Sequence, residues 1–131
     1  MPCIFVGNIP ESECTYLGRD AGWIAKFYEE VAEVSGTQAA DVELHLIPGT
    51  WMVFKQDGTK DKSHGLHVFI LWNAGRSVEQ KKALGNLIET FLSDYGLQTN
   101  LDITFFDMPP GTSFWFGGKM ICAPSDLPPA A

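Results

Sequence analysis

The sequence predicts an α+β fold in which two βαβ halves form a four-stranded mixed sheet, with two helices on one face and short hairpin strands added. Segments with strand-like and helix-like spacing follow the order strand–helix–strand, a hairpin insert, then strand–helix–strand. Equivalent positions also keep a constant offset, because Ile4 and Val68 are 64 residues apart and so are Ile24 and Ile88. A constant offset of this kind indicates an internal structural repeat.

The first half is expected to contain, in order, a strand at residues 2–7, a polar loop at 11–15, a helix at 17–35 and a strand at 42–46. Alternation of apolar and polar residues predicts the strands, and apolar residues at helical spacing from Ile24 to Val34 predict the helix. Gly36 is placed to end this helix, because glycine readily adopts the left-handed conformation of a helix C-terminus.

The rest of the chain is expected to form a short strand at 51–54, a turn at 56–58, an exposed loop at 59–65, a strand at 66–72, a helix from 77 to Gly96, a strand at 101–106 and an apolar patch at 114–116. Ser77 and Gln80 have the spacing of a capping box at the helix start. Lys81 and Lys82 lie outside the apolar stripe of this helix.

The strand at 66–72 is almost entirely apolar, a pattern typical of strands that are covered on both faces. The two predicted helices cover one face of the sheet, because each βαβ half needs a right-handed crossover. We therefore expect an oligomer to cover the other face.

The length of 131 residues predicts a single domain at 1–123, followed by a proline-rich tail at 124–131. A net charge of −7 argues against a nucleic-acid partner. Three cysteines without CxxC spacing indicate reduced thiols. No apolar run approaches the roughly 18 residues of a membrane span, and no signal peptide is visible. We expect a soluble, cytoplasmic protein that contacts no membrane and needs no cofactor.

Pro2 stands at the first position of the first strand, directly after Met1. Removal of Met1, which is usual before a small residue, would leave Pro2 with a free secondary amine. Burial and nearby cations lower the pKa of an amine, and a base titrating near the working pH suits proton transfer. The alternative is that proline is merely tolerated at the start of a strand.

The sequence resembles the tautomerase superfamily, which includes 4-oxalocrotonate tautomerase, macrophage migration inhibitory factor and malonate semialdehyde decarboxylase. The resemblance covers residues 2–121 and depends on Pro2 after Met1, the two βαβ halves, GRSVEQKK at 75–82, FFDMPP at 105–110 and Gly117-Gly118. Chain length and the segments 35–38 and 47–50 look most like the cis-3-chloroacrylic acid dehalogenase branch.

This resemblance implies a homotrimer with Pro2 at the bottom of a pocket near the subunit interface, acting as general base or, when protonated, as general acid. The family's arginine before the second helix falls on Arg76, where it would bind the carboxylate of a small-molecule substrate. Asn73, Phe105, Trp115 and Phe116 would line the pocket.

The chain departs from the dehalogenase pattern at four positions. Asn73 replaces a second arginine, and Trp115 or Phe116 stands where the branch has the carboxylate that activates water. Thr104 or Phe105 replaces the supporting tyrosine of that branch. The position of its histidine on the first helix falls near Val31 in this chain. These departures argue against hydrolytic dehalogenation, and the aromatic pocket favours enol–keto proton transfer on an apolar 2-oxo acid.

Two alternatives to a tautomerase stay open. One is a catalytically reduced trimer that binds a ligand or partner, and the other is a decarboxylase, hydratase or dehalogenase of a short carboxylic acid. His64 and His67 lack a third ligand, so we expect no metal there. Asp107 is either a polar neighbour of the pocket or a turn cap, and Cys3 is expected in the core.

Overall fold

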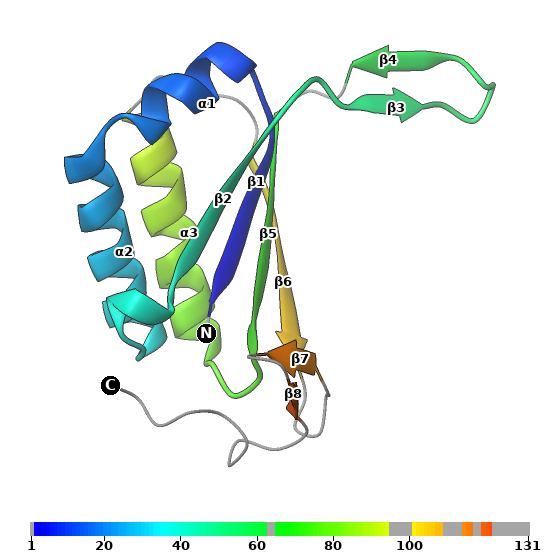
Figure 1. The fold of residues 1–131 in the computed structure, drawn as a ribbon. Coiled ribbons are helices and arrows are strands. Elements are labelled where there is room, and N and C mark those ends of the chain that lie inside the picture. Colours follow the sequence, from blue (N-terminus) through cyan, green and yellow to red (C-terminus); the bar gives the residue numbers. More distant parts are fainter. Residues whose placement is uncertain (1, 63–64, 95–100, 109–113, 117–118, 122–131) are drawn as a thin grey trace.

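Four strands form the central sheet of the computed structural model, which describes residues 2–62, 65–94, 101–108, 114–116 and 119–121 (Figure 1). The strands β1 (Cys3–Ile9), β2 (Glu43–Pro48), β5 (Leu66–Asn73) and β6 (Leu101–Met108) lie in the order β2-β1-β5-β6. β1 pairs with β2 and β5 with β6 in parallel, whereas β1 and β5 are antiparallel. The predicted mixed sheet built from two βαβ halves is confirmed.

The helices cover one face of this sheet (Figure 1). They are α1 (Glu11–Gly18), α2 (Ala21–Ser35) and α3 (Val78–Ser93), with a short 3₁₀ turn, η1, at Ala39–Asp41. The core lies between helices and sheet and consists mainly of buried aliphatic and aromatic side chains: Ile4, Val6, Ile9, Leu17, Phe27, Val31, Ala32, Val42, Leu66, Val68, Ile70, Trp72, Leu84, Ile88, Phe91 and Leu92. Within the described ranges, no helix combines the length and apolarity that crossing a membrane requires.

The predicted helix signals agree with the structure. Gly36 follows α2 in the left-handed conformation at φ 69°. Ser77 and Gln80 form the expected capping box at the start of α3, and the Gln80 side chain also donates to the carbonyl oxygen of Val34 at 3.1 Å. This last bond joins the start of α3 to the end of α2.

The loop predicted at residues 11–15 is wrong, because these residues belong to α1, and the helix predicted from 17 begins at Ala21 instead. Glu11 and Glu13 lie in the first turn of α1, where carboxylates interact favourably with the helix dipole. Only Leu17 of this helix is buried. The apolar periodicity that identifies helices is therefore absent here.

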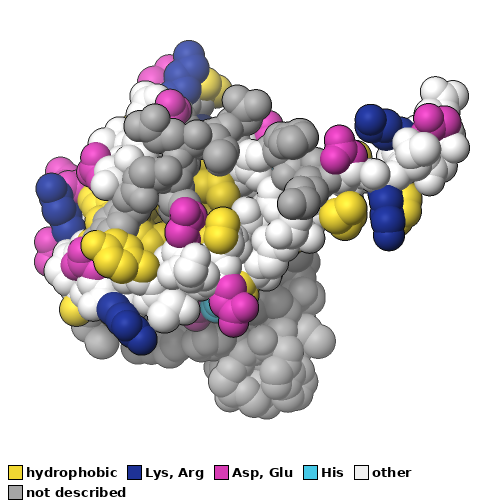
Figure 2. Space-filling model, turned by 90° about the horizontal axis from the view of Figure 1, so that it is seen from above, with side chains coloured by type: hydrophobic (Ala, Val, Ile, Leu, Met, Phe, Trp, Pro, Cys, Tyr) yellow, Lys and Arg dark blue, Asp and Glu magenta, His cyan; other side chains and the backbone are white. Residues whose placement is uncertain are grey.

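The exposed loop predicted at 59–65 is also partly wrong, since Lys60–Lys62 forms β4 and pairs with β3 (Met52–Phe54). The two strands pair through their backbones. This pairing does not require apolar side chains, and the second strand has none that would predict it. The hairpin stands away from the body of the molecule (Figures 1 and 2). Met52, Val53 and Phe54 are 45%, 49% and 71% exposed.

Asn8 anchors the insert that carries this hairpin. Its side-chain oxygen accepts a hydrogen bond from the backbone N–H of Trp51 at 2.8 Å, and its side-chain nitrogen donates to the carbonyl oxygen of Gly65 at 2.7 Å. The Trp51 ring stacks on His67, with centroids 5.0 Å apart. A Cβ added to Gly7 would lie 2.1 Å from the Trp51 ring. The indole therefore packs against the backbone at Gly7 at a distance that only glycine allows.

The helix-free face of the sheet, which we call the outer face, carries a partly exposed set of apolar, aromatic and polar side chains: Cys3, Phe5, Glu43, His45, Ile47, His67, Phe69, Leu71, Asp102, Thr104 and Phe106. Phe5 stacks on His45 at 4.7 Å, and Phe69 lies 6.1 Å from Phe106. Cys3 belongs to this face and is half-buried, so its predicted place in the core is wrong.

The last described strands are β7 (Phe114–Phe116) and β8 (Lys119–Ile121), which pair with each other. Their side chains lie outside the part of the molecule that the structure describes. So do Gly96, His64, Gly117-Gly118 and the tail at 124–131. The predicted domain boundary at residue 123 stays a prediction.

Candidate active site

Pro2 precedes β1 and is buried, with less than 2% of its surface exposed. Its carbonyl oxygen accepts a hydrogen bond from the backbone N–H of Glu43 at 3.1 Å, so Pro2 extends the pairing of β1 with β2. In the antiparallel pair of β1 and β5, Cys3 lies opposite Leu71. Continuing this register by one residue puts Pro2 opposite Trp72.

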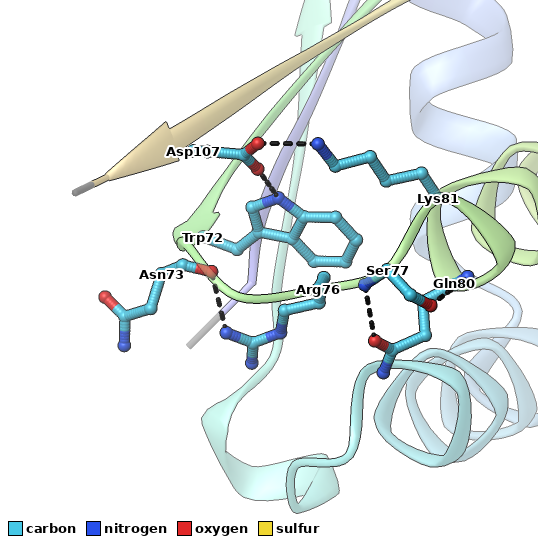
Figure 3. A network of polar contacts seen from close by, with 7 residues as sticks. All are labelled: Trp72, Asn73, Arg76, Ser77, Gln80, Lys81 and Asp107. Carbon is cyan, nitrogen blue, oxygen red and sulfur yellow. Dashed lines mark hydrogen bonds and ion pairs between the residues drawn. The ribbon is translucent and has the colours of Figure 1, made fainter. Parts of the chain in front are cut away.

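Trp72 continues this row to the edge strand, because it lies opposite Asp107 in the parallel pair of β5 and β6. The Trp72 indole N–H donates to one oxygen of Asp107 at 2.6 Å, and the Nζ of Lys81 lies 2.5 Å from the other (Figure 3). The hydrogen bonds from Lys81 and from Trp72 hold the pKa of Asp107 below its usual range, and the Lys81 and Arg76 charges add to this. Asp107 is therefore an anion at neutral pH.

Arg76 lies in the tight link between β5 and α3, where Gly75 adopts φ 111°. Its guanidinium carbon lies 5.4 Å from the Trp72 ring centroid, a cation–π geometry, and its Nη1 donates to the carbonyl oxygen of Asn73 at 2.9 Å (Figure 3). Among the described residues Arg76 forms no salt bridge with a carboxylate. The guanidinium is thus positioned by neutral groups and keeps donors for an incoming anion.

Asn73 and Phe105 complete the described part of the predicted site. Asn73 is exposed at the end of β5. Phe105 packs against Trp72, with centroids 5.4 Å apart, and lines an open groove between α3 and β6. Lys81 lines the same groove, which therefore borders the Trp72 and Asp107 pair.

The other candidate residues fall into two groups. Trp115 and Phe116 lie on β7, and their predicted contact with the site stays a prediction because their side chains are outside the described set. Val31 is fully buried in the core, and Thr104 lies exposed on the outer face opposite Phe69.

Sequence reasoning missed the partnership of Trp72, Lys81 and Asp107. Lys81 was expected to face away from the apolar stripe, yet its amine reaches Asp107 and its side chain is only 28% exposed. One signal was available: Asp107 lies two residues after Phe105, so alternation along a strand puts both on the same face.

Comparison with known proteins gives a consistent set of structural relatives. No protein-family model matches the sequence, and no curated protein matches it. Among solved structures, a domain of unknown function (DUF1904) from Sebaldella termitidis has a TM-score of 0.67 at 16% identity, covering 92% of this chain and 100% of that one. The F6 fused 4-OT wild type asymmetric trimer has a TM-score of 0.62 at 21% identity, covering 90% and 93%. Macrophage migration inhibitory factor from Toxoplasma gondii has a TM-score of 0.60 at 13% identity, covering 92% and 98%.

The chain has the tautomerase fold. The likeness extends over nearly the whole of each chain, so it concerns the complete double βαβ unit. At these identities, the likeness shows a shared fold. Within the tautomerase fold, the row of Pro2, Trp72 and Asp107 lies at the end of the sheet from which the chain leads to α3.

Proposed function

We propose that this protein is a tautomerase that interconverts the enol and keto forms of an apolar 2-oxo acid, with Pro2 as the proton-transferring base. The observation that carries the proposal is the environment of Arg76, which is held by Trp72 and Asn73 and forms no salt bridge with any described carboxylate. A guanidinium of this kind suits a substrate carboxylate, which it binds in a bidentate manner.

In this proposal the secondary amine of Pro2, freed by removal of Met1, takes the proton from the substrate carbon and returns it to the other tautomer. Burial of the residue supports the role, because removing an amine from water disfavours its charged form. Asp107 and Lys81 neutralise each other, so Arg76 supplies the positive potential of the site.

Four further points belong to the proposal. The half-buried apolar ring of Phe105, together with Trp115 and Phe116, would accept an aromatic or aliphatic substrate body. A homotrimer would cover part of the outer face, and one of the structural relatives, the F6 fused 4-OT, is described as an asymmetric trimer. A cytoplasmic location is consistent with the free thiols of Cys3 and Cys14. The segments 35–38 and 47–50 favour the cis-3-chloroacrylic acid dehalogenase branch, without its hydrolytic chemistry.

The test is the conversion of phenylpyruvate enol to its keto form by the protein with a free Pro2 terminus, compared with two variants. Pro2→Ala is expected to lower kcat by about 100-fold or more, the usual contribution of a positioned base. Arg76→Ala is expected to raise KM by about tenfold or more, because a charge-assisted bond to the substrate is lost.

Arg19→Ala is the matched control, since Arg19 is the other arginine of the chain and is exposed after α1. It should leave both kcat and KM unchanged. Full activity in Pro2→Ala would overturn the mechanism. Tight binding of phenylpyruvate with no turnover by the wild type would point instead to a ligand-binding trimer.

A further inference from the structure

Three potential metal ligands meet on the outer face, at the pair of strands β1 and β2. Cys3 lies directly opposite Glu43 in the parallel register, and His45 follows Glu43 by two residues on the same face. The Sγ of Cys3 lies 3.6 Å from the Oε2 of Glu43, and the Nε2 of His45 lies 3.1 Å from that oxygen. The three ligand atoms all lie within 4.8 Å of one another.

Two of these separations are close to the edges of a tetrahedral zinc site, and the ligand atoms of the third pair, Cys3 and His45, lie within 4.8 Å of each other. Zinc bonds of about 2.3 Å to sulfur and about 2.0 Å to oxygen or nitrogen give tetrahedral edges of about 3.5 Å for S···O and about 3.3 Å for N···O. The Cys3–Glu43 and His45–Glu43 pairs differ from these values by only a few tenths of an ångström. One ion can therefore contact all three side chains after small rotations.

Ring stacking and strand pairing restrict the orientation of these ligands. The Phe5 ring stacks on the His45 imidazole with an interplanar angle of 12°, which restricts the orientation of the imidazole. The backbone N–H of Glu43 donates to the carbonyl oxygen of Pro2 at 3.1 Å. The side chains of His45 and Glu43 are 46% and 50% exposed.

The Cys3 thiol donates a hydrogen bond to the Glu43 carboxylate. A bound divalent ion would displace the thiol proton and take both groups as ligands.

We propose that Cys3, Glu43 and His45 form a binding site for a divalent metal ion of zinc-like preference, on the outer face of the sheet. A mixed set of sulfur, nitrogen and oxygen ligands favours zinc over magnesium or calcium, which prefer oxygen ligands alone. Three protein ligands leave a fourth position for water or for a donor from elsewhere. The proposed tautomerase chemistry does not use these three side chains, although Cys3 directly follows Pro2 in the chain. The ligands come from two strands, with Cys3 and Glu43 40 residues apart, so no sequence motif marks the site.

The test is a titration of the untagged protein with Co²⁺, a spectroscopic substitute for zinc, in a Cys14→Ser, Cys122→Ser background. Cys3 is then the single cysteine of the chain. A thiolate-to-cobalt charge-transfer band should appear with one ion per chain and should bleach when Zn²⁺ is added. Adding Cys3→Ser should abolish the band.

Glu43→Gln and His45→Asn should each weaken Co²⁺ binding by about tenfold or more. Residues that only hydrogen-bond to a metal ligand already contribute about tenfold to affinity, and a direct ligand should contribute at least as much. Both positions are largely exposed, so these variants are expected to fold. His67→Asn is the matched control, since His67 lies on the same face but pairs with Asp102 at 3.8 Å. Absence of the band in the background protein, or a band insensitive to both Glu43→Gln and His45→Asn, would overturn the proposal.

Discussion

Asp107 forms an ion pair with Lys81, so in the proposed mechanism Arg76 is the cation that binds the substrate carboxylate. The Arg76 charge also contributes to the lowered pKa of Asp107, which shows that the two groups interact. Without Lys81, the Asp107 carboxylate would compete with a substrate carboxylate for Arg76. At the scale of single residues, the availability of Arg76 for a substrate thus depends on the ion pair between Lys81 and Asp107.

Replacing Lys81 by Met is therefore expected to raise KM for an apolar 2-oxo acid by about two- to fivefold, the size of a partly exposed ion pair, with little change in kcat. Steady-state kinetics of enol–keto conversion measures both constants. Lys82→Met is the control, because Lys82 is the exposed neighbour on α3. An equal KM in the Lys81 and Lys82 variants would contradict this role of Asp107.

The lowered pKa of Asp107 also predicts how stability depends on pH. A carboxylate whose folded-state pKa is below its ordinary value of 3.8 stabilises the fold fully above that value, and the contribution is lost as the pH falls through the folded-state pKa. Melting temperatures measured from about pH 6 down to about pH 3 should show Asp107→Asn below the wild type at the upper end. The difference should narrow as the pH falls, and a constant difference would contradict the ion-pair account.

At the scale of elements, the sequence predicts the helix boundaries that local signals define, and it misses elements that depend on contacts between distant residues. Gly36 ends α2, and the capping box of Ser77 and Gln80 starts α3. Both signals lie within a few residues of the boundary they define, so the sequence alone predicts these two boundaries. The helix α1 has a single buried side chain, and β4 forms only through its partner strand, so neither carries a periodic pattern.

The candidate site shows the same division. The assignment of Pro2 and Arg76 depends on the resemblance to the tautomerase superfamily, and their roles in the site stay predictions. The bond from Trp72 to Asp107 joins residues 35 positions apart, and only the register of β5 with β6 brings them together. Contacts of this kind depend on strand pairing, which a single sequence specifies weakly.

The contact of Trp51 with Gly7 gives the sharpest test of an element. Gly7→Ala places a Cβ 2.1 Å from the indole, so the ring must move and its stacking on His67 is disturbed. We expect a loss of about 1–3 kcal/mol in the free energy of unfolding, as in overpacked cores, with a changed near-ultraviolet circular dichroism spectrum.

Gly18→Ala is the control for this substitution, because a Cβ there meets nothing within 4 Å. Gly18 ends α1, where alanine costs less conformational entropy than glycine, so stability should be unchanged or slightly higher. Equal effects of the two substitutions would show that Trp51 does not depend on Gly7.

At the scale of the whole molecule, the outer face is the face of the sheet that the helices do not cover (Figure 1). Its partly exposed rings include Phe106, which is 47% exposed. Apolar and aromatic side chains in adjacent rows of a sheet are typical of an interface. A trimer would cover them and would also explain why β5 is apolar on both faces.

Phe106→Asp is therefore expected to convert a trimer into monomers, because a buried carboxylate without a partner opposes association. Light scattering coupled to size-exclusion chromatography measures the change as a threefold fall in mass. Tyr16→Asp serves as the control, since Tyr16 is 68% exposed on α1, away from the outer face. A wild-type protein with the mass of one chain would contradict the trimer.

The central claim, that Pro2 transfers the proton, is tested most directly by the state of the N-terminus. The rate of phenylpyruvate ketonisation should be measured for protein with a free Pro2 amine and for the same protein retaining Met1, with each terminus verified by mass spectrometry. We predict activity with the free amine and a loss of about 100-fold or more with Met1 retained, because the Pro2 nitrogen is then an amide without basicity. Equal rates for the two forms would contradict the claim.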